Sequence, residues 1–203
     1  MTIGNASFLV AALEHAWATI RAHHPQVPEA VLVVASGSSG RRLKWGHFAA
    51  GRWQHAGSQR PEVLVGGEGL ARGAREVLTT LLHEAAHGLA DARRIPDTSR
   101  GGRYHNRRYA ALAHELGLEV ARVDGIGWSA TTLPEVTAAG YAAVLAELEA
   151  RLVLWRRQEA AGQATSRNLL VCVWGCPRRI RVAPSTLAQA PILCAACALP
   201  FTP

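Results

Sequence analysis

Residues 83–87 read His-Glu-Ala-Ala-His, and no other feature of the chain limits its fold and chemistry as strongly. The pentapeptide lies within residues 74–94, where apolar residues recur with helical spacing. Histidines four residues apart on a helix lie on one face, one turn apart, so both imidazoles can reach one metal ion. Zinc prefers such nitrogen ligands, and a carboxylate beside the ion can take a proton from water. The pattern therefore predicts a catalytic zinc site with His83 and His87 as ligands and Glu84 as general base.

The same stretch has a broad apolar face that leaves the two histidines on the other side of the helix. An amphipathic helix with ordinary solvent-facing histidines is therefore the alternative interpretation. That interpretation does not explain why Glu84 lies next to His83, or why a further histidine and two cysteine pairs follow in the sequence. The apolar face consists of Val77, Leu78, Leu81, Leu82, Ala85, Ala86 and Leu89.

A catalytic zinc needs a third protein ligand, and residues 104–116, which have helical periodicity, can supply it. His105 falls on the apolar stripe of this segment, whereas His114 projects to the opposite side and Glu115 lies off the stripe. We expect His105 to be the third ligand, with a buried core histidine as the alternative and Glu115 as a less favoured ligand. Pro96 and the Gly pair of residues 95–103 predict a loop that brings His105 back to the metal.

Two residues next to this loop are candidates for stabilising the oxyanion that forms when water attacks a peptide carbonyl. They are Arg103 and Tyr104. The sequence does not rank them, and Tyr104 can equally well be a packing residue.

All four cysteines of the chain lie within its last 32 residues, as two close pairs. Each pair can donate two thiolates from a tight turn, and four thiolates complete a tetrahedral zinc site. Disulfides are the alternative, which a reducing cytoplasm disfavours. We expect a structural zinc to supply much of the stability of this short segment. Its ligands would be Cys172, Cys176, Cys194 and Cys197.

The chain carries a formal net charge of +7 and has a pI near 10.0, which favours an anionic partner such as nucleic acid. Lys44 is the only lysine, so a high arginine content from a GC-rich genome is an alternative source of this charge. Near the cysteines, arginine accompanies an aromatic residue, a combination that binds single-stranded nucleic acid through phosphate contacts and base stacking. Packing of the tryptophan and solvation of the arginines is the alternative. These candidates are Trp174, Arg178, Arg179 and Arg181.

The organisation of the chain predicts an α+β fold with a small sheet, the helix that carries His83 and His87, and further helices. Helices are expected over residues 7–23 and 138–160, strands over 31–35, 43–53 and 62–65, and a loop over 128–132. An edge strand of this sheet can line the cleft and pair with an extended substrate. We expect a metal-binding domain over residues 1–160, a linker over 161–167 and a small zinc domain over 168–203. No secretory or membrane-spanning segment is expected, which favours the cytoplasm, with association with the nucleoid as an option.

Taken together, these residues resemble the SprT-like zinc metalloproteases, the family that includes the Spartan proteases of DNA–protein crosslink repair. The resemblance is carried by residues 82–87, by His105 with the aromatic Tyr109 after it, and by cysteine pairs that follow a helical spacer. It implies a zincin-like domain with a C-terminal zinc ribbon. His83, His87 and His105 would hold zinc, with Glu84 as general base. It also implies hydrolysis of DNA-associated proteins. The first cysteine pair is more widely spaced than the usual ribbon, and the loop before His105 is longer than in the family.

Two other functions are compatible with the sequence. One is a regulatory protease that resembles the ImmA/IrrE type and cleaves a repressor, although that type does not predict the cysteine pairs. The other is a DNA-binding protein in which both metals are structural. A closed four-ligand site at His83 and His87 would indicate the latter, and residues 1–171 contain no cysteine to complete it.

Overall fold

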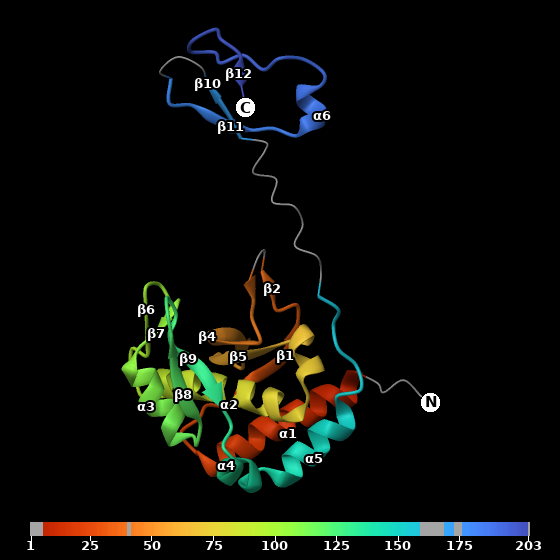
Figure 1. Cartoon of the computed structure of the whole chain (residues 1–203), viewed down its shortest axis with the longest axis vertical. Coiled ribbons are helices and arrows are strands. Elements are labelled where there is room, and N and C mark those ends of the chain that lie inside the picture. The colour runs from red at the N-terminus through yellow and green to blue at the C-terminus, as the bar shows by residue number, and fades with distance from the viewer. Residues whose placement is uncertain (1–5, 40–41, 159–168, 173–175, 203) are drawn as a thin grey trace. The chain divides into compact units, whose positions relative to one another are not determined.

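In the computed structural model of the chain, the stretch that carries residues 83–87 forms helix α2 (Ala74–Ala92), as its periodicity predicts. The structure describes residues 6–39, 42–158, 169–172 and 176–202. It divides the chain into two units, Met1–Gln158 and Glu159–Pro203 (Figure 1). The predicted linker, 161–167, lies outside the described residues. Both units contain helices and strands, which confirms the predicted α+β class. Within the described residues, no helix combines the length and the apolar character needed to cross a membrane.

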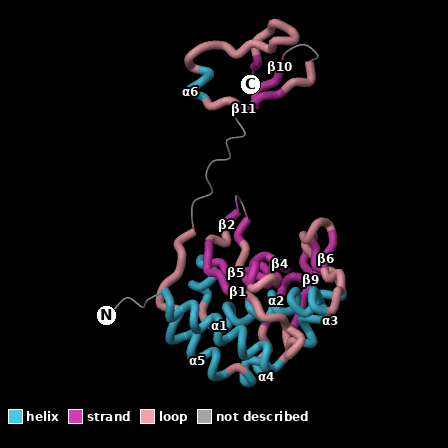
Figure 2. The backbone as a smooth tube through the Cα atoms, turned by 180° about the vertical axis from the view of Figure 1, so that it is seen from behind, coloured by secondary structure: helices cyan, strands magenta, loops and turns pink. Residues whose placement is uncertain are grey.

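Helix α2 is the centre of the first unit because its apolar face is buried along its whole length. It contacts α1, α3, α5 and the strands of the main sheet. In this unit the strands gather on one side and the longer helices on the other (Figure 2). The helices are α1 (Ala6–His23), α3 (Arg107–Glu115), α4 (Glu135–Gly140) and α5 (Ala142–Arg151), with a 3-10 helix, η1 (Gly67–Arg72), before α2.

The main sheet has the strand order β1-β5-β4, with β1 parallel to β5 and β4 antiparallel to it. Strand β4 is therefore an edge strand, and it packs against α2. A two-stranded ribbon, β2 (Ser38–Ser39) with β3 (Arg42–Leu43), precedes it. All three predicted strands are present in this region. The observed bounds are β1 (Val31–Ala35), β4 (Gly46–His55) and β5 (Ser58–Gly66).

A second sheet, of order β6-β7-β9-β8, lies beside the main sheet and next to α3 (Figure 1). Two predictions are wrong here. Residues 128–132 were expected to form a loop, but they belong to a strand that pairs with β8 and β7. His105 was expected on a helix, but it lies on a short strand, because the Asn106 side chain caps α3 one residue later. The strands are β6 (Thr98–Ser99), β7 (Tyr104–His105), β8 (Glu119–Val123) and β9 (Gly127–Thr132).

The expected helix over 138–160 is also wrong in its length, because α5 ends at Arg151. The chain beyond it is held by Arg156. Its backbone N–H donates to the Gly67 carbonyl at 3.0 Å, and its Nε lies 3.4 Å from the Glu68 carboxylate. Glu68 is buried and also accepts hydrogen bonds from Ser36 Oγ and the Gly37 N–H. We name this arrangement the Arg156 anchor.

The second unit has a three-stranded antiparallel sheet of order β11-β10-β12, and Cys172 is the last residue of β10. Its buried side chains, among the described residues, are Leu170, Cys172 and Cys194. So small an apolar core cannot offset the conformational entropy lost on folding. The elements are β10 (Leu169–Cys172), β11 (Arg179–Arg181), α6 (Pro184–Leu187) and β12 (Phe201–Thr202).

Candidate metal centre

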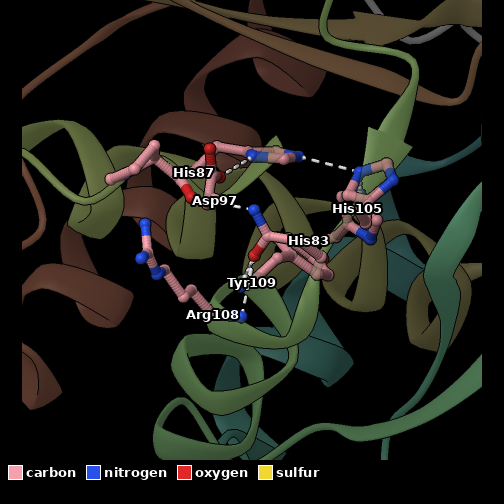
Figure 3. Close-up of polar contacts among 8 residues, drawn as sticks. His83, His87, Asp97, His105, Arg108 and Tyr109 are labelled. Carbon is pink, nitrogen blue, oxygen red and sulfur yellow. Dashed lines mark hydrogen bonds and ion pairs between the residues drawn. The ribbon is translucent and has the colours of Figure 1, made fainter. Parts of the chain in front are cut away.

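Three histidines meet at one point of the first unit (Figure 3). His83 and His87 come from successive turns of α2, and His105 comes from β7. The Nε2 atom of His105 lies 3.3 Å from that of His83 and 3.2 Å from that of His87. A tetrahedral ion with bonds of about 2.0–2.1 Å, the range of zinc, separates its nitrogen ligands by about 3.3–3.4 Å. The three nitrogens therefore have the spacing of metal ligands, and the cluster can hold an ion.

The other ring nitrogens orient two of these imidazoles. His87 Nδ1 lies 2.5 Å from Asp97 Oδ2, and His83 Nδ1 lies 3.3 Å from Thr131 Oγ1. Such contacts, typical around metal-binding histidines, fix the tautomer so that Nε2 keeps its lone pair for the metal. His105 Nδ1 is buried and has no hydrogen-bond partner among the described residues.

The ring of Tyr109 forms a wall of the cluster. Its centroid lies 4.5–4.9 Å from those of the three imidazoles, and its side chain is fully buried. Tyr109 lies four residues after His105, on the apolar stripe of residues 104–116, and the structure buries this side chain completely. A rigid aromatic wall limits the movement of all three rings and so pre-organises them for an ion.

The protonation of the cluster favours metal binding at two of its rings. Burial, and then the neighbouring histidines, lower the pKa of His83 well below its usual value. Burial and then His87 likewise lower the pKa of His105. Burial also acts to lower the pKa of His87, but its hydrogen bond with Asp97 and the charge of Glu84 outweigh this and raise it. Neutral imidazole is the form that binds metals, so His83 and His105 are ready for an ion.

Glu84 lines the same cleft as the three histidines, but its side chain is only 4% exposed. It accepts a hydrogen bond from the backbone N–H of Phe48 on the edge strand β4. Burial raises the pKa of Glu84 to about 7, against the opposing effects of His87 and Phe48. A bound cation nearby would lower this pKa again, because it favours the carboxylate.

The cleft around the cluster has a volume of about 1210 Å³, larger than the roughly 300–1,000 Å³ of typical small-ligand sites. Edge strand β4 forms one wall and β9 another. His47, Arg103 and Asp97 also line it. Of the two oxyanion candidates, Arg103 therefore lies at the cleft, whereas the Tyr104 ring stacks against the Arg100 guanidinium at 4.9 Å.

The four cysteines of the second unit form the other cluster. Their sulfur atoms lie within 4.8 Å of one another, and Cys176 Sγ is 3.9 Å from Cys194 Sγ. Zinc–sulfur bonds of about 2.3 Å imply a separation of about 3.8 Å in a tetrahedral site. The backbone N–H of Ala196, with a contribution from the Arg178 guanidinium, lowers the pKa of the Cys194 thiol to about 6. This cluster too can hold a metal ion.

The predicted nucleic-acid residues have different positions. Arg178 donates to Cys194 Sγ at 3.8 Å, so it contacts the cysteine cluster. Arg179 and Arg181 are exposed and lie two residues apart on β11, so they share one face of the sheet. Trp174 lies outside the described residues.

Sequence reasoning missed three contributors to the site: Asp97, Thr131 and Phe48. Thr131 contacts His83 and Phe48 contacts Glu84 across long stretches of the chain, whereas Asp97 follows His87 by ten residues. Of the three, only Asp97 could have been suspected from the sequence. A carboxylate close to a metal-binding histidine commonly accepts a hydrogen bond from the ring nitrogen that does not bind the metal.

Comparison of the chain with protein-family models, with curated proteins and with solved structures finds no match.

Replacing Asp97 by Asn should weaken binding of added Zn²⁺ roughly 10- to 100-fold, because the variant loses the charge that holds the His87 ring. The affinity can be measured by competition with a chromogenic chelator. Asp91 is the matched control, since it lines the same cleft and is exposed. Equal affinities for Asp97→Asn and Asp91→Asn would show that Asp97 does not support the metal ligands.

In the metal-free protein, Glu84 should make stability fall as the pH rises from about 4.5 to about 7. The pKa of this carboxyl is 4.5 when unperturbed and about 7 in the fold, so the folded state binds more protons in this window. Such a shift corresponds to about 3 kcal/mol at pH 8. Metal-free Glu84→Gln should therefore be more stable than metal-free wild type in urea unfolding at pH 8, and should have no such advantage at pH 4. If the stability difference between Glu84→Gln and wild type is the same at pH 8 and at pH 4, the ionisation of Glu84 is not its cause.

Proposed function

We propose that this protein is a zinc-dependent endopeptidase, with His83, His87 and His105 as metal ligands and Glu84 as general base. The observation that carries the proposal is the convergence of three Nε2 atoms, at 3.2–3.3 Å, beside a buried glutamate in an open cleft. Among the described residues, this cluster has no fourth His, Cys, Asp or Glu ligand. Catalytic zinc sites have three protein ligands and an open position, whereas structural sites are closed.

When bound, zinc would supply a Lewis acid that polarises the peptide carbonyl and makes water more acidic. Glu84 then accepts a proton from the attacking water and passes it to the leaving amine. The hydrogen bond from the Phe48 N–H holds its carboxylate toward the cleft wall. Asp97 keeps the His87 ring in one orientation throughout the reaction.

The edge strand β4 supplies a binding site for an extended peptide. The Trp45 carbonyl accepts from the Gly66 N–H, so the carbonyls and N–H groups of alternate residues, Gly46 and Phe48, face the outer edge of the sheet. The Phe48 N–H is used by Glu84, which leaves the Phe48 carbonyl and both polar backbone groups of Gly46 for a substrate. Addition of a strand to a sheet edge is a general mode of peptide recognition.

The proposal is tested with purified protein and a fluorogenic peptide mixture. Wild type should hydrolyse peptides, lose activity with a chelator and regain it with Zn²⁺. His105→Ala should lose both the activity and one of two bound zinc ions, and His114→Ala, on the exposed side of α3, should retain both. Two tightly bound zinc ions without any hydrolysis would instead support the non-catalytic binding protein.

We further propose that the substrates are proteins bound to DNA. The charge of +7, the exposed pair Arg179 and Arg181, and the resemblance to SprT-like proteases support this partner. Single-stranded DNA should stimulate cleavage, and the double variant Arg179→Gln/Arg181→Gln should reduce the stimulation and the DNA affinity. Cleavage that is indifferent to DNA but selective for a repressor would favour the regulatory protease.

Gly46→Ala should lower the catalytic rate roughly 10- to 100-fold while zinc stays bound. A Cβ at this position would lie 2.6 Å from Glu84 Oε1 and 2.7 Å from Thr80 Cγ2, so either β4 or the general base must shift. Displacement of a reacting group by about 1 Å can cost this much activity. Gly140→Ala is the control, because a Cβ there has nothing within 4 Å. An unchanged rate in Gly46→Ala would show that β4 does not position Glu84.

A further inference from the structure

Arg72, the last residue of η1, places a cation on the wall of the cleft. Its guanidinium carbon lies 4.4 Å from the ring centroid of Trp45, which also lines the cleft and is 39% exposed. A guanidinium over the face of a tryptophan is attracted by the ring quadrupole. The two side chains therefore form one surface, which we name the Arg72–Trp45 pair.

Neutral acceptors hold this guanidinium in place. Its Nη2 donates to Thr80 Oγ1 at 2.7 Å and to the Glu76 carbonyl at 3.4 Å, and its Nε donates to the Gly69 carbonyl at 3.3 Å. Among the described residues, no carboxylate lies within ion-pair distance of Arg72, and the two N–H groups of Nη1 have no acceptor. Burial lowers the pKa of Arg72 against the opposing charge of the exposed Glu76, which reflects a cation partly removed from water. A fixed, partly desolvated cation that makes no direct ion pair is a good receptor for a carboxylate.

The pair lies close to the proposed reacting groups. Thr80, which holds the guanidinium, is one helical turn before Glu84 on α2. Trp45 directly precedes Gly46, where an added Cβ would lie 2.6 Å from Glu84 Oε1. The exposed Lys44 lines the cleft at the same end of β4 and adds a second positive charge.

We propose that the Arg72–Trp45 pair is a specificity subsite that receives an acidic side chain of the substrate. The carboxylate would bind Nη1 of Arg72, and the Trp45 ring would cover the methylene groups of the side chain. This inference rests on the proposed peptidase function. The position of the pair also predicts on which side of the scissile bond the acidic residue lies. A substrate strand antiparallel to β4, the more stable pairing, has its C-terminal side next to Trp45, at the start of β4. The acidic residue therefore follows the scissile bond.

The test is a set of peptides that are identical except for one position, which carries Asp, Asn or Lys before or after the cleaved bond. Wild type should prefer Asp to Asn by roughly 10-fold in kcat/KM when the residue follows the bond. Arg72→Gln should bring the Asp/Asn ratio close to 1, and Arg72→Glu should favour Lys. Arg122→Gln, an exposed arginine of β8, is the control and should keep the wild-type ratio. An Asp/Asn ratio that survives in Arg72→Gln, or a preference only before the bond, would overturn the proposal.

A binding measurement separates this proposal from the peptidase itself. Fluorescence anisotropy of the labelled Asp and Asn peptides is measured with zinc-loaded wild type, Arg72→Gln and Arg122→Gln, each under conditions without turnover. If no peptide is cleaved but the Asp peptide binds more tightly and loses this advantage only in Arg72→Gln, the subsite stands and the catalytic assignment fails. Equal binding of both peptides to wild type would refute the subsite, whatever the activity.

Discussion

Glu84→Gln should reduce peptide hydrolysis roughly 10²- to 10⁴-fold and leave the bound metal in place. Glutamine has nearly the same shape as glutamate and can still accept the hydrogen bond from the Phe48 N–H, so the edge strand and α2 keep their packing. It cannot accept a proton from water, so the step that generates the nucleophile loses its base. Activity is measured as kcat on a fluorogenic peptide, and zinc is measured per chain.

The control for this variant is Glu149→Gln, an exposed glutamate of α5, which should retain wild-type activity. Loss of metal together with activity in Glu84→Gln would make the glutamate a support of the metal site rather than the base. Undiminished activity would remove the proposed mechanism altogether.

Cys194→Ser should cost the chain one bound metal ion and unfold the second unit, while the first unit keeps its own ion and its stability. The physical reason is the size of the core, because Leu170 is the one buried apolar residue other than cysteines among the described residues of this unit. Structural zinc sites of this kind contribute apparent binding free energies of about 10–16 kcal/mol, which such a core cannot replace. Zinc content and limited proteolysis report the two effects.

Ala195→Ser is a matched control, since it introduces the same residue at the exposed neighbouring position. It should keep both ions and the protease resistance of wild type. A folded second unit in Cys194→Ser, or a metal-free wild type that resists proteolysis beyond Gln158, would show that this unit does not depend on a metal.

Helix α2 and the main sheet could be predicted from the sequence because their signals are local. Helical periodicity over residues 74–94 and apolar runs before glycines mark α2, β1 and β5, and the structure contains all three. His83 and His87 follow from their spacing alone. His105 was chosen for its place on an apolar stripe, and the structure brings it to the other two histidines from a strand instead.

The misassigned start of α3 shows how a local signal was overlooked. Asn106 is a preferred N-cap residue, and its side chain accepts from the N–H groups of Arg108 and Tyr109. Reading that cap would have placed His105 before the helix. Similarly, Asp124-Gly125 is a strong hairpin signal that would have predicted the β8–β9 pairing.

Other features depend on contacts that no short stretch of sequence contains. Asp97 lies ten residues after His87, beyond the end of α2, so its contact with that ring depends on the path of the chain after the helix. The end of α5 at Arg151 is likewise not a matter of helix propensity, since residues 152–158 contain neither glycine nor proline. Hydrogen bonding of Arg156 to Gly67 accompanies this departure from the helix.

The Arg156 anchor decides how short a catalytic fragment can be. A fragment that stops where α5 stops would remove the guanidinium beside Glu68 and leave a carboxylate that is 7% exposed without this cation. Loss of a cation beside a buried carboxylate should lower the stability of the fragment, because the carboxylate stays buried while its ion pair is gone. Truncations designed for crystallisation or for separate assay of the peptidase should therefore extend through Gln158.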